Sequence, residues 1–448
     1  MDHLYIDNFR NFFNTSIPIK KFNFLVGENS SGKTSILTLM QLLCSFEFWN
    51  TGKFFDGFVD VRLFSDLVNP KFGKEYFTIG IYDPEQISMK VEKPRSSSKK
   101  NIKYYFMRAL MMKFKNSQGV PMIERINLIA GDYFVTIVKK RKVFRYGYKK
   151  IKGNNFKKLL ADCINVELPT TEKLRRPNIV NLLSGNNSFE NVSLHDVILR
   201  TANLVLRNEV TESENTRVIF NTSPGYGNFV WISPIRTQPE RTYDRYHENY
   251  SPEGKHTPYE LNFNLRTKTF RDQINKFGNE SGLFEELLKI SKGKEKYSPF
   301  QLNVKLNKLS QNIINVGYGV SQILPILNEL LKNWNEINFA IQQPEVHLHP
   351  KAQTALGKLF YKINLRNDCI YFVETHSDFI IDSYRYEQKI SKTNEQKPAQ
   401  ILFFKRGRSG NKVYAIDIEN NGSISEKQHP DYRKFFINES IKLLALNL

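Results

Sequence analysis

The segment "GENSSGKT", residues 27–34, constrains the fold of this chain more than any other. It matches the pattern G-x-x-x-x-G-K-[ST] and lies between a strand pattern, "FNFLVG", and an apolar helix pattern, "SILTLMQLLCSF". Gly27 and Gly32 let the backbone curl so that its N–H groups point at phosphate oxygens. Lys33 is expected to reach the outer phosphates, and the Thr34 hydroxyl is expected to bind Mg²⁺. The segment therefore predicts a strand, a phosphate-binding loop and a helix.

After residue 216, apolar strand patterns alternate with helix patterns. The strand patterns "NFAIQQ" and "CIYFVETHS" are separated and followed by the helix patterns "KAQTALGKLFYKIN" and "DFIIDSYRYEQKIS". This alternation predicts an α/β fold with a largely parallel sheet that helices cover on both faces. We expect a head made of residues 1–83 and 216–448, with a basic α+β lobe inserted over 84–215. No heptad pattern is sustained, so no long coiled-coil arm is expected.

Basic residues outnumber acidic ones, 65 to 45, which gives a formal net charge of +20. Residues 137–158 concentrate this excess, with ten Lys and Arg, no acid and interleaved aromatic residues; Lys139, Lys140, Arg141 and Lys142 are consecutive. Such a pattern suits nucleic-acid phosphates and stacked bases. An acidic protein partner and a strand pair with a merely lysine-rich outer face are the alternatives.

The chain has features typical of a cytoplasmic protein. Its three cysteines, Cys44, Cys163 and Cys369, lie far apart and form no CxxC pair, which is typical of a reducing compartment. The N-terminal segment is too polar for a signal peptide. No apolar run approaches the roughly 20 residues of a membrane span. We therefore expect no membrane partner.

Three further segments carry polar residues at the ends of predicted elements. "GYGVSQILPIL", 317–327, is a glycine-rich turn in which Ser321 is expected to cap a helix and offer its hydroxyl to an anion; an ordinary helix cap is the alternative. "FAIQQPEVHLHP", 339–350, and "YFVETHS" end strands beside the expected phosphate loop, where Mg²⁺ and an attacking water are usually held. His376 in the last segment could contact a γ-phosphate, although a lone histidine is more often structural.

The order of these motifs resembles that of ABC-type ATPases related to SMC proteins. Such ATPases occur in the overcoming-lysogenisation-defect (OLD) nucleases and in bacterial antiphage systems of the PARIS, Septu and retron-associated types. "NFRNF" at 8–12 and "WISPIRTQPERTY" at 231–243 also resemble family segments. The resemblance covers about 1–82 and 216–448. It implies an ABC/SMC-type P-loop head that uses ATP and Mg²⁺ and pairs head to tail, as a homodimer or a larger homo-oligomer, around the nucleotides.

The resemblance also assigns residues to the nucleotide. Contacts within one subunit are assigned to Arg10, Gly27, Asn29, Ser30, Gly32, Lys33, Thr34 and Ser35, and contacts from the opposite subunit to Gly319 and Ser321. Thr34 and Gln342 are the positions implied near Mg²⁺. His376 matches the switch histidine, and His349 falls in the loop that crosses the dimer interface.

One departure from the relatives concerns catalysis. Their strand usually ends in "EEPE" or "EQPE", whereas here Gln342 and Gln343 occupy the first two positions. Glutamine forms hydrogen bonds but carries no charge and is no base. Together with Glu345 and His376 these residues form the expected catalytic set, and the two amides predict ATP binding with slow hydrolysis. Slow turnover could be native, or Gln342 could be an engineered Glu→Gln trap.

The resemblance implies a role in antiphage defence. Family nucleases carry an acidic Toprim domain, but the residues after His376 show no acidic D-x-D pattern. We therefore expect the chain to restrain or scaffold a separate nuclease, Toprim or HNH effector until a trigger, such as DNA or a phage protein, is sensed. The alternatives are an SMC-like ATPase of DNA repair or chromosome maintenance, and a transporter subunit, from whose "LSGGQ" element "GYGVSQ" departs.

Overall fold

The structure of the chain is a computed structural model. It describes residues 2–84, 89–92, 102–140, 143–151, 156–165, 193–209, 215–219, 229–244, 249–291, 293, 298–332, 334, 337–391, 393, 396–425 and 430–432.

Two compact units make up the described chain, and neither is continuous in sequence. Unit 1 consists of Met1–Ile19, Thr34–Tyr226 and Arg406–Lys412, and unit 2 consists of Lys20–Lys33, Gly227–Lys405 and Val413–Leu448. Unit 1 therefore combines the N-terminal strands with the region that follows residue 84. The boundaries predicted at 84 and 216 stay predictions.

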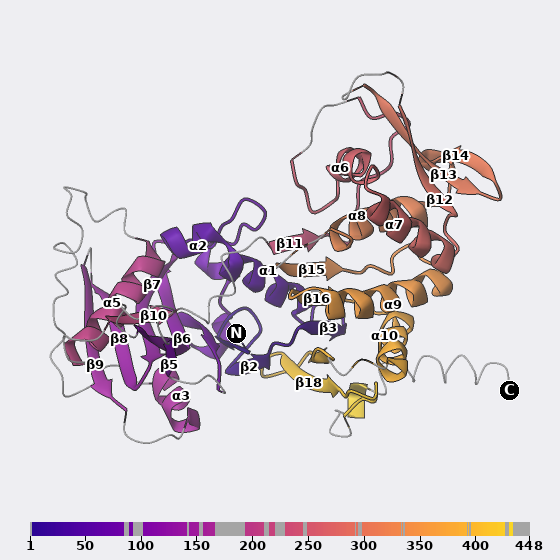
Figure 1. Ribbon diagram of the computed structural model, residues 1–448. Helices are drawn as coiled ribbons and strands as arrows, with labels where there is room; N and C mark the ends of the chain where they lie inside the picture. The colour runs from indigo at the N-terminus through magenta and orange to yellow at the C-terminus, as the bar shows by residue number, and fades with distance from the viewer. Residues whose placement is uncertain are drawn as a thin grey trace. The chain divides into compact units, whose positions relative to one another are not determined.

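A six-stranded sheet forms the centre of unit 2 (Figure 1), in the order β11-β15-β16-β3-β17-β18. Its strands are β3 (Phe22–Gly27), β11 (Phe229–Ile232), β15 (Asn338–Gln342), β16 (Ile370–Glu374), β17 (Ala399–Lys405) and β18 (Lys412–Ile418). The pairs from β11 through β17 are all parallel. Every residue of β3 and of β15 is buried, as expected for central strands of a sheet covered on both faces. The parallel sheet predicted from the strand and helix patterns is therefore present.

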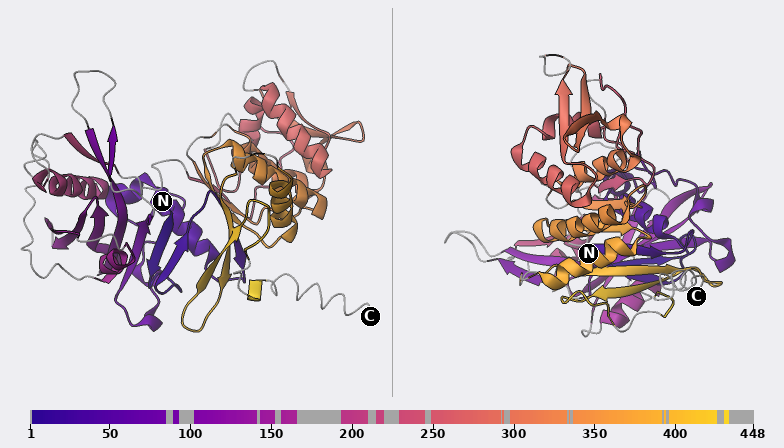
Figure 2. Two further views of the ribbon diagram at one scale, coloured as in Figure 1. Left: turned by 60° about the horizontal axis from the view of Figure 1, so that its bottom comes forward. Right: turned by 90° about the vertical axis from the view of Figure 1, so that its right-hand side faces the viewer.

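Helices and a small second sheet complete unit 2. The helices are α6 (Thr257–Asn264), α7 (Lys268–Ser281), the 3-10 helix η4 (Ile313–Asn315), α8 (Tyr318–Leu330), α9 (Pro350–Arg366) and α10 (Asp378–Ile390). The second sheet consists of β12 (Glu286–Ser291), β13 (Phe300–Leu306) and β14 (Leu309–Asn312). Helices α9 and α10 run side by side, as Figure 2 shows from two directions. Aromatic rings of β3 pack against Tyr384 of α10, at 4.9 Å from Phe22 and 5.3 Å from Phe24 between ring centroids.

Unit 1 is built on a nine-stranded sheet whose main path is β2-β1-β4-β6-β7-β8-β9, with β5 and β10 also paired to β6. Its strands are β1 (His3–Asp7), β2 (Thr15–Pro18), β4 (Tyr76–Tyr82), β5 (Met89–Glu92), β6 (Ile102–Ser117), β7 (Val120–Ala130), β8 (Tyr133–Lys140), β9 (Val143–Lys150) and β10 (Asn215–Ile219). Its helices are α1 (Lys33–Cys44), which begins at the last residue of the adjoining unit 2 segment, α2 (Phe46–Thr51), η1 (Phe64–Asp66), η2 (Pro70–Phe72), α3 (Phe156–Asn165) and α5 (Leu194–Glu209). Helix α3 buries Cys163 against Met111 and Phe134 of this sheet, and burial raises the pKa of the Cys163 thiol.

The basic segment 137–158 lies mainly on the antiparallel pair β8 and β9. The Lys139 ammonium lies 5.7 Å from the centre of the Phe144 ring, and Lys149 approaches Asp162 at 3.8 Å. Arg141 and Lys142 lie outside the described residues. A paired strand with basic side chains fits all three interpretations stated above: nucleic-acid binding, an acidic protein partner and a lysine-rich outer face.

Helix lengths bear on two further expectations. Of the helices that the structure describes, the longest is α9, with 17 residues. The described part of the chain therefore contains no long coiled-coil arm, in agreement with the missing heptad pattern. Nor does any helix in the described part combine the length and apolar character needed to cross a membrane.

Gly357 on α9 allows α9 and α10 to approach closely, and we predict that Gly357→Ala destabilises the protein. A Cβ at this position would lie 2.3 Å from the backbone oxygen of Ile380, which cannot move away as a flexible side chain could. Alanine normally favours a helix over glycine by about 1 kcal/mol. Here we expect the reverse, a loss of about 1–3 kcal/mol through overpacking, measured by urea unfolding.

Lys351→Ala, at an exposed position of the same helix, is the matched control and should change the unfolding free energy by at most about 0.5 kcal/mol. A Gly357→Ala variant as stable as the wild type would show that the two helices are not in this close contact.

Candidate functional site

The loop 27–33 connects β3 to α1 and has the backbone conformation that its glycines predict. Gly27, Ser30 and Gly32 have φ angles of 145°, 61° and 97°. A Cβ on Gly27 would lie 2.1 Å from the backbone oxygen of Phe404 on β17, so no larger residue fits there. The sequence pattern thus folds into a compact loop at the carboxyl end of a central parallel strand, where backbone N–H groups commonly bind anions.

Lys33 is buried beneath this loop, with 4% of its surface exposed. Its ammonium donates hydrogen bonds to the carbonyl oxygens of Gly27 and Glu28, each at 2.9 Å. It also lies 3.9 Å from a carboxylate oxygen of Glu374. Burial lowers the pKa of Lys33, and the charges of Glu374 and Glu28 oppose this shift. The lysine therefore holds a positive charge inside the loop, where a phosphate could replace the carbonyls as its partner.

Gln342 and Glu374 end the neighbouring strands β15 and β16 and face each other in register. The Gln342 Nε2 donates to Glu374 Oε2 at 2.8 Å, and the indole Nε1 of Trp231 donates to Gln342 Oε1 at 2.9 Å. Both ends of the Gln342 amide are thus engaged within the protein. The amide contacts a buried carboxylate; its place near Mg²⁺ stays a prediction.

Glu345 holds the segment that follows β16. Its Oε2 accepts a hydrogen bond from Thr375 Oγ1 and its Oε1 accepts one from the backbone N–H of His376, both at 2.8 Å. The half-buried His376 has a lowered pKa because of burial and of the positive charge of Lys33, with Glu345 and Glu374 opposing the shift. Glu345 therefore positions the predicted switch histidine, and both of its oxygens already accept hydrogen bonds.

Arg236 lies against the same strand ends and is almost fully buried, with 5% of its surface exposed. Its Nη2 donates to the carbonyl oxygens of Gln342 and Gln343, at 2.9 and 3.4 Å. Burial lowers its pKa to about 10, while the negative charge of Glu345 opposes the shift. Among the described residues, its Nε and Nη1 have no hydrogen-bond partner. Arg236 thus adds a second buried positive charge to the site.

Comparison with known proteins places the chain in a family. The model of the family described as "AAA ATPase domain" matches residues 1–224 and 235–381. The chain belongs to this family. No curated protein matches it. The α/β P-loop ATPase fold class predicted from the sequence, with a largely parallel sheet covered by helices, is confirmed by the family match together with the topology of the sheet.

Three solved structures of SMC heads were also matched. A head bound to the C-winged helix domain of ScpA has 12% identity and a TM-score of 0.41, and the match covers 93% of this chain and 98% of that one. A head domain from Thermotoga maritima has 10% identity and a TM-score of 0.36, with 92% and 98% covered. A Pyrococcus furiosus head with an extended coiled coil, bound to the C-terminal domain of ScpA, has 12% identity and a TM-score of 0.39, with 98% and 99% covered.

The AAA ATPase domain differs from the sequence prediction at the start of α8. The cap residue is Gly317, and no side chain caps the helix. Ser321 lies one turn further in, with 7% of its surface exposed, and its hydroxyl donates to the carbonyl of Tyr318 at 2.9 Å. The prediction that Ser321 caps this helix was therefore wrong, because helix α8 already begins at Tyr318. Gly319 allows close contact with the loop after β15, since a Cβ on any larger residue at this position would lie 2.8 Å from the backbone oxygen of His347.

The remaining predicted residues divide by exposure. Asn29, Ser30 and Thr34 are exposed, so the Thr34 hydroxyl is accessible to a ligand. Ser35 is buried and its Oγ accepts a hydrogen bond from Arg10 Nη1 at 2.9 Å. Burial lowers the pKa of Arg10, with Asp66 opposing. His349 caps α9, its Nδ1 accepting from Ala352 N. These contacts assign structural roles to Arg10, Ser35 and His349; their roles toward nucleotide stay predictions.

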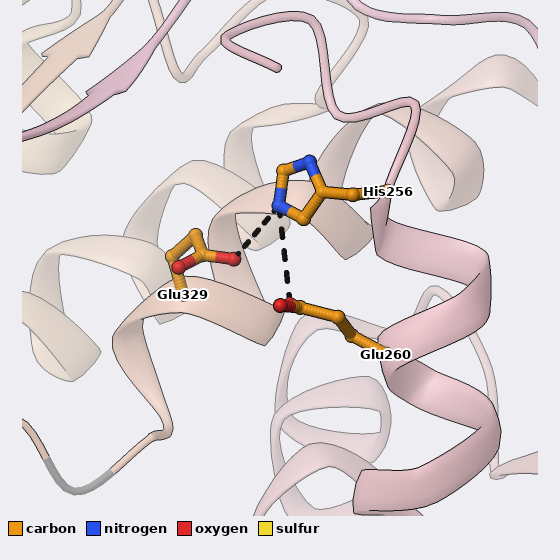
Figure 3. A group of neighbouring side chains, drawn as sticks. All are labelled: His256, Glu260 and Glu329. Atoms are coloured by element: carbon orange, nitrogen blue, oxygen red, sulfur yellow. Dashed lines mark hydrogen bonds and ion pairs between the residues drawn. The ribbon is translucent and has the colours of Figure 1, made fainter. Parts of the chain in front are cut away.

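A separate group in unit 2 has the spacing of a metal site. Figure 3 shows His256, Glu260 and Glu329 converging, with potential ligand atoms within 4.8 Å of one another. His256 Nε2 lies 3.1 Å from Glu329 Oε1. Lys332 Nζ approaches both carboxylates, at 2.5 Å from Glu260 and 2.8 Å from Glu329. The ammonium thus occupies the place of a cation.

The histidine tautomer argues against a metal as well. The backbone N–H of Ser251 donates to His256 Nδ1 at 3.1 Å. A backbone N–H can only donate, so Nδ1 is the unprotonated nitrogen and a neutral ring carries its proton on Nε2. Nε2 then has no lone pair for a metal and donates to Glu329. We therefore interpret this group as a hydrogen-bonded ion network that links α6 to α8.

Sequence reasoning missed three residues that the structure brings to this site: Trp231, Arg236 and Glu374. Trp231 and Arg236 stand in "WISPIRTQPERTY", a segment that resembled the family but received no role. Glu374 stands directly before Thr375 and His376 in "YFVETHS". The available signal was that parallel strands end at one edge of a sheet, which brings the residues after each strand together.

Glu329 in the ion network predicts a pH-dependent contribution to stability. Burial raises its pKa, but hydrogen bonds from His256 and Lys332 and the charge of Lys332 outweigh burial and lower the pKa below the ordinary 4.5. The stabilisation is then complete above pH 4.5 and is lost as the pH falls through the lower folded-state pKa. We expect Glu329→Gln to cost about 1–3 kcal/mol at pH 7, and less as the pH falls below 4.5, measured by urea unfolding.

Glu419→Gln, at an exposed position, should show no such pH-dependent difference. Zinc and EDTA should leave the unfolding midpoint of the wild type unchanged. A rise in the midpoint on adding zinc, lost in Glu329→Gln, would contradict the network interpretation in favour of a metal site.

Proposed function

We propose that this chain binds ATP with Mg²⁺ in the loop 27–34 and hydrolyses it slowly. The observation that carries the proposal is the buried Lys33 ammonium, which donates to two loop carbonyls and lies 3.9 Å from Glu374. A lysine in this position is suited to bind the outer phosphates. Membership in the AAA ATPase domain family supports the same ligand.

The residues of the loop fit the proposed ligand. The Gly27 position excludes a side chain, and in loops of this pattern the backbone N–H groups bind phosphate oxygens. Thr34 is exposed and is the second residue of α1, directly after Lys33. At this position of a P-loop, the hydroxyl commonly contacts Mg²⁺. When bound, the nucleotide would supply the phosphoanhydride bond, and its cation would neutralise charge on the phosphates.

Slow turnover follows from the residues at the strand ends. Gln342 and Gln343 carry amides, which do not act as general bases. Glu345 accepts hydrogen bonds on both oxygens from Thr375 and His376. Among these three side chains, Glu345 has the only carboxylate that could take a proton from an attacking water. Both of its oxygens already accept hydrogen bonds within the protein.

We further propose that two copies pair around the nucleotide. The turn that begins α8 exposes the Tyr318 ring, with 54% of its surface accessible, and this ring lies 5.7 Å from that of the exposed His347. His349 is exposed next to them in sequence. Aromatic and histidine side chains grouped in this way suit a protein interface.

The proposed biological role is the ATP-dependent restraint or scaffolding of a separate nuclease effector in an antiphage system. The resemblance of the ordered motifs supports it. Within the described residues after His376, three acidic side chains form ion pairs: Asp382 with Arg385, Glu387 with Lys358 and Asp417 with Lys20. Paired in this way, they do not resemble the free acidic cluster of a nuclease. DNA or a phage protein is the proposed trigger.

Lys33→Ala should weaken ATP binding at least about tenfold, because the variant loses the cation that faces the phosphates. The measurement is equilibrium titration with a fluorescent ATP analogue, with and without Mg²⁺. Lys268→Ala, which removes an exposed lysine at the start of α7, is the charge-matched control and should bind as the wild type does. Unchanged affinity of Lys33→Ala in both conditions would overturn the proposed function.

Tyr318→Glu should separate nucleotide binding from pairing. We expect the wild type to sediment as a dimer with a non-hydrolysable ATP analogue and Mg²⁺, and the variant to stay monomeric with unchanged nucleotide affinity. Tyr386→Glu, at an exposed tyrosine of α10, is the control and should dimerise. A Tyr318→Glu variant that still dimerises would place the interface elsewhere.

A further inference from the structure

The orientation of the Gln342 amide is fixed by its neighbour on β11. The indole Nε1–H of Trp231 can only donate, so the atom that it contacts at 2.9 Å must be the amide oxygen. The amide nitrogen then points at Glu374 Oε2, 2.8 Å away. Since an amide nitrogen can only donate, this carboxylate oxygen is the acceptor. The hydrogen bonds therefore run one way, from Trp231 through Gln342 to Glu374.

Glu374 is better placed than Gln342 to serve the phosphate loop. Strand β16 lies between β15 and β3, so Glu374 is one strand spacing, about 4.8 Å, nearer to the strand that enters the loop. Its other oxygen, Oε1, lies 3.9 Å from Lys33 Nζ. Only 6% of the residue is exposed. A buried carboxylate beside the phosphate-binding lysine is the kind of group that P-loop ATPases direct toward a divalent cation.

We propose that Glu374 supplies the negative charge that the divalent cation of the nucleotide requires, and that Gln342 is a positioning residue that orients Glu374. The carboxylate function has thus moved from the end of β15 to the end of β16. A glutamate at 342 would place two carboxylates 2.8 Å apart, where they cannot both ionise. An amide at 342 instead donates a hydrogen bond to the carboxylate at 374. The inference rests on the proposed binding of ATP with Mg²⁺.

Glu345 does not compete for this role. Its two oxygens accept hydrogen bonds from Thr375 Oγ1 and from the His376 backbone, directly after Glu374. It fixes the chain at the end of β16 and thereby helps to hold Glu374 in place.

The test compares nucleotide affinity with Mg²⁺ and with EDTA, using the fluorescent ATP analogue and the full chain. For the wild type, Mg²⁺ should tighten binding. Glu374→Gln should reduce this Mg²⁺-dependent gain roughly 10- to 100-fold. In EDTA the same variant should bind as well as the wild type or better, because a negative charge near the phosphates has been removed. Unweakened binding in EDTA also shows that the variant is folded.

Two further variants make the test specific. Asp368→Asn removes a carboxylate that pairs with Lys21 just before β16, and should leave the Mg²⁺ gain unchanged. The double variant Gln342→Glu/Glu374→Gln keeps one carboxylate and one amide in the pair but moves the carboxylate to the end of β15. If the carboxylate must stand at the end of β16, the double variant should lose as much of the Mg²⁺-dependent gain in affinity as Glu374→Gln does.

The outcomes separate this inference from the proposed function. If Lys33→Ala weakens binding but Glu374→Gln keeps the full Mg²⁺ gain, the inference is wrong and the proposed function stands. Full recovery of the gain in the double variant would likewise overturn the placement at β16. If Lys33→Ala changes nothing, the proposed function itself fails.

Discussion

The parallel pairing of β3, β16 and β15 is the constraint on which the site depends. Parallel strands end at the same edge of a sheet, so three segments that lie far apart in sequence meet there. The pairing register sets Gln342 opposite Glu374, and β16 next to the strand that leads to Lys33. A shift of one residue in β16 would turn Glu374 to the other face of the sheet. The chemistry of the site thus follows from backbone hydrogen bonds in the sheet.

Buried charges need partners, and the site meets this need with backbone as well as side chains. Lys33 donates to carbonyls of its own loop, and Arg236 donates to carbonyls at the end of β15. Gln343 and His347 have φ angles of 42° and 64°, so the segment after β15 turns sharply. Arg236 therefore stabilises an irregular backbone while its charge faces Glu345.

The sequence predicted the elements of the site better than their connections. The P-loop pattern located Lys33 and the glycines, and alternating apolar patterns located β15, α9, β16 and α10. The sequence did not reveal that β16 lies between β15 and β3, because the order of strands in a parallel sheet need not follow their order along the chain. Without that order, the contact between Gln342 and Glu374 could not be predicted. The cap assigned to Ser321 failed for a local reason, since the helix is capped by Gly317, four residues before Ser321.

Trp231 gives the site an optical property. The chain has three tryptophans. The indole groups of Trp49 and Trp334 donate to backbone carbonyls, of Leu43 and Glu329, whereas that of Trp231 donates to the side chain of Gln342. Any ligand that draws Glu374 away disturbs the amide and, through it, the environment of one indole ring. The protein therefore contains a natural fluorophore two hydrogen bonds from the carboxylate, and its emission could report occupancy of the phosphate loop without a label.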